Sequence, residues 1–441
     1  MTTTYEPNDP RYLDEADVRR ELTRAFDLCH GCRRCVDLCT VFPSLFEMLD
    51  RAPGEGAGRL TPAEQDAVTE QCFQCTSCRV GCPYGDDSPM RLDVARLVLR
   101  AEAMKTAAGH HTLRRRATTQ LLGRADLLGR VAARLPSLSG RLATARPGSP
   151  ARRMLAVVTG ISAVRRLPRF AGPRFSSGLR RQAATGVARR EVAVFPGCVV
   201  DFEQPAVGSD LVGVYARNGV RCTATTAGCC GAPWLHAGDL KRFARVAVRN
   251  AAILADEVRA GRDIVVTEPG CGHVLRRAYC DHVAGPDAEL VAGHTFDAVE
   301  YLMDLHRSEG IDTVFGGEVP TRIVYHPAPQ LRGVGTGVPG RESPGRALME
   351  LIGAEVVVVD GASGSESWWG LRADQEQRAL LLAARFAERL TRAGGDAVAA
   401  DGGLTRLAIA EQTGEAAWHP IQLIARAYGL PSQGPAARGG L

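Results

Sequence analysis

The 441-residue chain is 45% hydrophobic and 23% charged and has a formal net charge of +5, a composition typical of globular rather than disordered proteins. Its fourteen cysteines are too few for a disulfide scaffold. Residues 1–20 lack the apolar core of a secretory signal, and no apolar run approaches the length of a membrane span. We therefore predict a cytoplasmic protein with room for two or three domains.

Helices are predicted around the first cysteines. Residues 14–28 carry apolar side chains at helical spacing, and Thr61 to Glu64 are typical of a capping box with Pro62 at the first helical position. Ser88 and Pro89 predict the start of another helix, whose apolar face would carry Leu92, Ala95, Leu99 and Ala103. Residues 1–105 are expected to form a helical domain.

Eight cysteines in this region form two groups with the spacing C-x2-C-x2-C-x3-C. Three thiolates at this spacing wrap around one [4Fe–4S] cluster, and the fourth usually crosses to the other cluster. We predict two [4Fe–4S] clusters, one held by Cys29, Cys32, Cys35 and Cys82, and the other by Cys72, Cys75, Cys78 and Cys39. Zinc knuckles also use C-x2-C pairs, but two complete four-cysteine motifs favour iron and sulfur.

The next segment is strongly basic. Residues 91–190 contain 22 lysines and arginines against three acidic residues, a formal charge of +19. Apolar residues recur between the arginines, which predicts amphipathic helices in an Arg-rich linker over residues 106–190. Three interpretations are open: a linker packed on the acidic remainder, a peripheral contact with a membrane or membrane partner, and nucleic-acid binding. The last is disfavoured because only Phe170 and Phe175 could stack on bases, so we expect no nucleic-acid partner.

From residue 191 onward the pattern is α/β, with short apolar runs at residues 192–195, 264–266, 323–325 and 356–359 and helical stretches at 239–260 and 374–393. Alternating strands and helices predict parallel sheets with sites at the carboxyl ends of strands. Equivalent positions recur about 130 residues apart, Cys198 with Pro329 and Cys271 with Gly402. We expect two similar halves, residues 191–310 and 311–441.

The doubled cysteine motif, followed by Gly197-Cys198, Cys229-Cys230-Gly231 and Cys271, resembles the CCG-domain (cysteine-rich domain) iron–sulfur proteins. Within this family, which includes the heterodisulfide reductase-related proteins, the layout is most similar to the CCG-domain subunit of anaerobic glycerol-3-phosphate dehydrogenase. The resemblance implies an N-terminal α-helical ferredoxin-like domain followed by two pseudo-repeated α/β CCG half-domains, an α+β and α/β fold.

The resemblance also implies that Cys198, Cys229, Cys230 and Cys271 are ligands in the first half. Adjacent cysteines can hold two irons of a non-cubane cluster, and a third iron–sulfur cluster or zinc are both open there. Cys222 and Cys280 match no motif.

The second half has lost every matching thiol. Its corresponding positions are Pro329, Trp368, Trp369, Gly402 and Thr405. Both indoles are large enough to fill the space of a missing cluster, and we expect one CCG metal centre rather than two.

The chain is therefore expected to be an electron-transfer subunit of a multi-subunit oxidoreductase. Its electrons would come from a flavoprotein dehydrogenase, because this chain has no Gly-rich loop with nucleotide-binding spacing. They would pass through the two [4Fe–4S] clusters toward a quinone or membrane acceptor at the inner face of the cell membrane. The alternative is a heterodisulfide-reductase-like thiol/disulfide oxidoreductase that uses the first CCG cluster.

Overall fold

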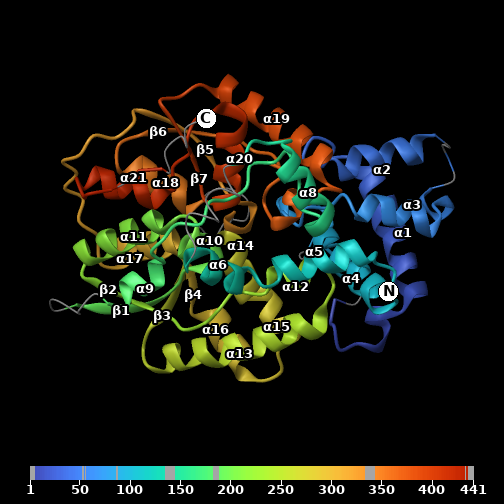
Figure 1. Ribbon diagram of the computed structural model, residues 1–441, viewed down its shortest axis with the longest axis horizontal. Helices are drawn as coiled ribbons and strands as arrows, with labels where there is room; N and C mark the ends of the chain where they lie inside the picture. The colour runs from blue at the N-terminus through green and yellow to red at the C-terminus, as the bar shows by residue number, and fades with distance from the viewer. Residues whose placement is uncertain are drawn as a thin grey trace.

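The computed structural model describes residues 5–51, 54, 56–85, 88–134, 145–181, 188–332, 343–432 and 434–435. N-terminal helices lie at one end of the molecule, and two α/β parts lie beside them, one above the other in the view of Figure 1. The mixed α/β class with parallel sheets is as predicted.

The N-terminal part is helical, and its helices are α1 (Glu15–Cys32), α2 (Val41–Asp50), α3 (Pro62–Thr69) and α4 (Val94–Ala107), with short 3-10 turns at Pro10–Leu13, Ala57–Arg59 and Ser77–Arg79. The capping box predicted at Thr61 and Glu64 is confirmed. The helix start predicted at Ser88 and Pro89 is wrong. Arg91 adopts a left-handed φ of 44°, and Asp93 caps α4 by accepting a hydrogen bond from the backbone of Arg96 at 3.0 Å.

One core joins the helices to the cysteine loops. Leu22, Phe26, Leu45 and Leu97 are buried in it, and Cys29, Cys35, Cys39, Cys72 and Cys78 pack against its edge. The helices therefore hold both cysteine groups at the rim of a single apolar cluster.

The basic segment contains α5 (Leu113–Leu122), α6 (Ala125–Arg134), α8 (Pro150–Thr159) and α9 (Phe175–Leu179); residues 135–144 and 182–187 of the predicted linker lie outside the described residues. Close packing fixes α5 and α6 on the first α/β half. A Cβ at Gly123 would lie 2.2 Å from the Trp234 indole, and one at Gly129 would lie 2.6 Å from the Phe202 ring.

Two arginines of this segment are buried and have polar partners within the chain. Arg152 donates to the carbonyls of Ser162 and Arg165 at 2.9 and 2.7 Å, and Arg165 pairs with Glu411 at 2.8 Å. Since a buried charge needs such partners, these contacts support the interpretation of the segment as a scaffold packed on the rest of the chain. They leave the exposed side of the helices available for another role.

The first α/β half has a parallel sheet in the order β2-β1-β3-β4. Its strands are β1 (Arg190–Phe195), β2 (Val220–Ala224), β3 (Asp263–Val266) and β4 (Thr295–Asp297). Its helices are α10 (Gly197–Phe202), α11 (Pro205–Arg217), α12 (Ala232–His236), α13 (Leu240–Arg259), α14 (Pro269–His273), α15 (Tyr279–His282), α16 (Pro286–Gly293) and α17 (Ala298–Ser308), with a π-helical turn at Val274–Ala278.

The second half repeats this order with β6-β5-β7, followed by a parallel bridge from Ala399 to Trp418 where the first sheet has β4. Its strands are β5 (Arg322–His326), β6 (Glu355–Val358) and β7 (Ala397–Ala400). Its helices are α18 (Pro344–Leu351), α19 (Glu376–Ala393), α20 (Gly403–Thr413) and α21 (Pro420–Ala427), with 3-10 turns at Pro329–Leu331 and Trp368–Leu371. The matching strand orders agree with the repeat seen in the sequence.

The two halves share a core. Val192 and Tyr215 of the first half are buried in the same apolar cluster as Tyr325 and Ile421 of the second. The helices α11 and α21, and likewise α17 and α18, contact one another across this interface. The shared core sets the carboxyl ends of the two sheets against each other.

Candidate metal centres and the cavities beside them

The thiols of the first predicted cluster lie near one another. Burial raises the pKa of Cys29 to about 12, and the neighbouring thiols that add to this shift are those of Cys35, Cys82 and Cys32. The chain ends α1 with Arg33 in the left-handed region, at φ 54°, so the loop that follows turns back sharply. Cys82, distant in sequence, is thereby a neighbour of the first group.

The second set shows the same crossing. Burial raises the pKa of Cys78 well above its ordinary value, and the thiols of Cys75, Cys72 and Cys39 add to the rise. Gln74 and Thr76 lie between these cysteines in the loop, and the backbone of both has a positive φ. The fourth cysteine of each motif thus lies beside the other group.

The crossed ligand sets nevertheless stay predictions. Within the parts of the chain that the structure describes, no three or more histidine, cysteine, aspartate or glutamate side chains converge as a ready-made ion site. The residues fit iron–sulfur clusters by their donor chemistry, eight thiols in two neighbourhoods, because thiolates are the usual cluster ligands.

The cysteines of the first α/β half lie where its strands end. Cys198 is on α10 directly after β1, Cys229 and Cys230 follow β2, and Cys271 is on α14 after β3. Because the carboxyl ends of parallel strands meet at one edge of a sheet, these four side chains come together.

Their sulfurs form a connected series. Hydrogen bonds from Cys198 and Cys230 lower the pKa of Cys229 well below its ordinary value. Hydrogen bonds to Cys229 and Cys271, together with burial, raise the pKa of Cys230. The donor chemistry and closeness of the four thiols fit an iron–sulfur cluster or zinc. Cys222 lies in β2 and Cys280 is exposed, and neither lines the cavity described next.

Gly197 keeps room for this thiol group. Its φ is 61°, and a Cβ added to it would lie 3.2 Å from the sulfur of Cys271. We expect Gly197→Ala to lower metal content in the first half, because the substitution combines a left-handed strain of about 1–2 kcal/mol with crowding of a thiol. Metal analysis and absorbance of the anaerobic protein provide the measurement.

The control for this prediction is Gly270→Ala, since Gly270 has no atom within 4 Å of an added Cβ. It lies beside Cys271 and should leave metal content unchanged. Equal metal loss in both variants, or none in Gly197→Ala, would show that the close approach at Gly197 does not matter.

A small cavity of about 100 Å³ joins the two halves at these thiols. Cys198, Cys229, Cys230 and Cys271 line it, together with second-half positions Pro329, Trp368, Gly402 and Thr405. The positions that the sequence repeat pairs with cysteines therefore face the cysteines themselves. Gln74, from the N-terminal cysteine loop, lines the same cavity.

The two tryptophans do not behave alike, which corrects the expectation that both fill the space of a missing cluster. Trp368 is half-buried, lines the cavity and packs against the cluster of Cys198, Val199 and Phe202. Trp369 is buried in another cluster with Phe73 and Leu382, and its indole lies under the Arg372 guanidinium. Successive residues in the 3-10 turn point in different directions, so Trp368 contributes to the cavity and Trp369 to the contact with the N-terminal helices.

Several polar residues of the cavity wall were not among the predicted site residues, and three of them are Glu268, His273 and His326. Burial raises the pKa of Glu268 to about 7, and its Oε2 accepts a hydrogen bond from the backbone of Gly403 at 3.0 Å. Burial lowers the pKa of both histidines to about 4, so their rings are neutral at pH 7. The strand-end rule could have identified Glu268, which follows β3, and His326, which ends β5.

Comparison with known proteins agrees with this site. The sequence profile of the CCG cysteine-rich domain matches residues 192–276, which contain all four of these cysteines. Residues 192–276 are therefore similar to the CCG cysteine-rich domain that the motifs indicated.

Two relatives show similarity over longer stretches. One is a subunit of the anaerobic glycerol-3-phosphate dehydrogenase of Escherichia coli (strain K12), which is 24% identical over 402 residues that cover 82% of this chain and 99% of the relative. The other is a subunit of the fumarate reductase (CoM/CoB) of Methanothermobacter marburgensis, which is 28% identical over 216 residues, 47% of this chain and 39% of that relative.

Proposed function

We propose that this chain is an iron–sulfur electron-transfer subunit of a multi-subunit oxidoreductase. The observation that carries the proposal is the arrangement of twelve cysteines in three neighbouring groups, two in the N-terminal part and one at the carboxyl ends of the first sheet. Both relatives are named as subunits of redox enzymes, which supports the same class.

The residues of the chain set the order of the three groups. Cys75 adds to the raised pKa of Cys35, so the first two groups adjoin. Gln74 and Gln330 line the 100 Å³ cavity beside the thiols of the first half, and Gln330 donates to the Cys75 carbonyl at 3.3 Å. The second group therefore adjoins the third. When bound, iron–sulfur clusters accept and donate single electrons. Cys29, Cys32, Cys35 and Cys82 would hold the outermost one.

The proposed electron donor is a flavoprotein subunit, and the proposed acceptor is a quinone or a membrane partner. We expect a flavoprotein to co-purify with this chain under anaerobic, native conditions, and its substrate to bleach the visible absorbance of the clusters. The alternative, a thiol/disulfide oxidoreductase, predicts that the isolated chain reduces a small disulfide catalytically with a chemical reductant. That result without any flavoprotein would contradict the electron-transfer proposal.

The proposed membrane contact is the outer face of the basic segment. Leu113, Met154, Val157 and Val158 are 82%, 73%, 73% and 68% exposed. The helices α5 and α8 lie side by side, since Arg114 donates to the Ala156 carbonyl at 3.0 Å and Thr118 to that of Thr159 at 2.7 Å. Figure 1 shows α5, α6 and α8 crossing the face turned toward the viewer.

This face pairs apolar side chains with the exposed arginines Arg116 and Arg153, a combination that suits anionic lipid headgroups. Among the described residues, none of the helices has the length and hydropathy needed to cross a bilayer. We therefore propose a peripheral contact with the inner face of the cell membrane.

We expect the chain to bind anionic vesicles at low salt and to release them as salt rises. Replacing Val157 and Val158 together by Asp should weaken this binding about tenfold or more, because two apolar contacts are lost and two negative charges are gained. Co-sedimentation with vesicles measures the effect.

Val314→Asp is the matched control, because Val314 is 72% exposed and its carbonyl accepts a hydrogen bond from Arg217 of α11 at 3.4 Å. Its vesicle affinity should equal that of the unmodified chain. Equal weakening in both variants, or no binding at low salt, would leave the basic segment with its scaffold role alone.

A further inference from the structure

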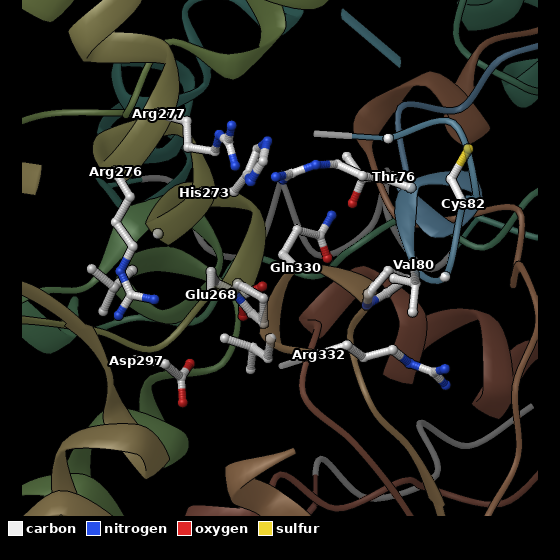
Figure 2. Close-up of a pocket in the computed structure, with 18 of the residues that line it drawn as sticks. Thr76, Val80, Cys82, Glu268, His273, Arg276, Arg277, Asp297, Gln330 and Arg332 are labelled. Carbon is white, nitrogen blue, oxygen red and sulfur yellow. The ribbon is translucent and has the colours of Figure 1, made fainter. Parts of the chain in front are cut away.

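A cavity of about 830 Å³ lies between the Cys82 loop and the carboxyl ends of β3, β4 and β5. It adjoins the smaller cavity of about 100 Å³ beside the thiols of the first half, because Glu268, His273 and Gln330 line both. Figure 2 shows Arg276, Arg277 and His273 on one side of it and Val80 and Cys82 on the other. Its volume falls within the range of cavities that hold small molecules.

The wall of this cavity is rich in guanidinium groups. Four arginines line it, namely Arg79, Arg276, Arg277 and Arg332. They come from three separate segments: the 3-10 turn Ser77–Arg79, the π-helical turn Val274–Ala278 and the residue after the turn Pro329–Leu331. These arginines therefore do not belong to one solvated helix face. The fold brings them together from distant parts of the sequence.

Three of these four arginines pair with a carboxylate that lies behind the wall. Arg276 pairs with Glu300, Arg332 with Asp360 and Arg79 with Asp93, and none of the three carboxylates lines the cavity. A guanidinium has five donors in a planar fork, so the carboxylate partners of Arg276 and Arg332 position these two groups and leave further donors for a ligand.

Among the described residues that line the cavity, the acidic ones are Glu268 and Asp297, and both are buried. Burial raises the pKa of Glu268 to about 7 and that of Asp297 to about 8. Near neutral pH both carboxyls therefore carry less than their full negative charge, and four arginines line the same cavity. Asp297 is also engaged as the cap of α17, where it accepts from the backbone of Val299 at 2.8 Å.

We propose that this cavity binds a small molecule with two or more carboxylate or phosphate groups, which Arg276 and Arg277 grip from one side and Arg332 from the other. Arginine forks match carboxylate and phosphate oxygens in pairs, and the separated arginines favour a ligand with separated anionic groups. The bound molecule would lie beside Cys82, within the region where the electron-transfer clusters are proposed. Binding itself requires no electron transfer, so this inference can fail or succeed independently of the proposed function.

The test uses the anaerobically purified full chain and calorimetry with two probes, tricarballylate as the polycarboxylate and fructose 1,6-bisphosphate as the phosphate. Fructose is the neutral control. We expect one of the charged probes to bind and fructose not to bind. The probe that binds shows whether the cavity prefers carboxylate or phosphate groups. Arg277→Gln and Arg332→Gln should each weaken that binding about tenfold, since each removes a charge-assisted contact.

Arg249→Gln is the matched control, because Arg249 is an exposed arginine of α13 that does not line the cavity. Hydrogen exchange on the unmodified chain gives a second measurement that needs no variant, and the bound probe should slow exchange in residues 76–85 and 274–278. Failure of both probes to bind at about 1 mM, equal weakening by Arg249→Gln, or unchanged exchange at these segments would overturn the proposal.

Discussion

Cys39→Ser should deplete the cluster of the second cysteine group and leave the cluster of the first group intact. The two predicted clusters together hold about eight iron atoms, so we expect a loss of about four. The reason is the crossing of the chain, which makes the Cys39 thiol a neighbour of Cys72, Cys75 and Cys78. Iron analysis and the low-temperature spectra of the reduced protein measure the loss.

Paired substitutions make this prediction sharper. Cys39→Ser combined with Cys72→Ser should lose no more iron than either alone, because both act on one cluster. Cys39→Ser combined with Cys29→Ser should lose both clusters. The exposed Cys280 supplies the control Cys280→Ser, which should keep all the iron. If the iron losses caused by Cys39→Ser and Cys29→Ser did not add in the double variant, the crossed assignment would be wrong.

Cys229→Ser should abolish the metal centre of the CCG domain completely, and no second centre should remain in the α/β part. The thiols of Cys198 and Cys230 both hydrogen-bond to Cys229, so its loss interrupts the connected series of sulfurs. The facing positions Pro329, Trp368, Gly402 and Thr405 offer neither sulfur nor imidazole. Metal analysis of the full chain should then give only the iron of the two N-terminal clusters.

Trp368→Ala is the informative partner variant, since Trp368 lines the cavity and packs against the apolar cluster that contains Cys198. It enlarges the cavity but removes no thiol, so we expect the CCG metal to stay while its spectrum shifts. A metal signal in the α/β part that survives Cys229→Ser would contradict the single-centre interpretation and would favour disulfide chemistry between two centres.

The parallel strands could be predicted from the sequence because buried parallel strands are short, continuous apolar runs. The run at residues 192–195 is β1 and the run at 264–266 is β3, each with one or two further residues at its start. The Ser-Pro signal at residue 88 predicts too early a start for α4, because the helix begins after a second capping residue, Asp93. A local signal cannot show which of two caps the tertiary structure uses.

The cysteines of the N-terminal candidate sites could be predicted because their spacing is typical of iron–sulfur cluster ligands. The cavities could not, because they depend on how three distant segments approach one another. Arg276 and Arg332 carry no motif, and only the fold brings them to one wall. Likewise nothing in the sequence distinguishes Trp368 from Trp369, whose surroundings follow from the geometry of a single turn.

The core shared by the two α/β halves has a consequence for cooperativity. Helices α11 and α17 of the first half rest on α21 and α18 of the second, and their buried side chains belong to one apolar cluster. Separating the halves would expose that cluster to water, so residues 188–432 should unfold in a single transition rather than two. The second half, which has no cysteine, thus remains indispensable to the thermodynamic stability of the half that has kept its thiols.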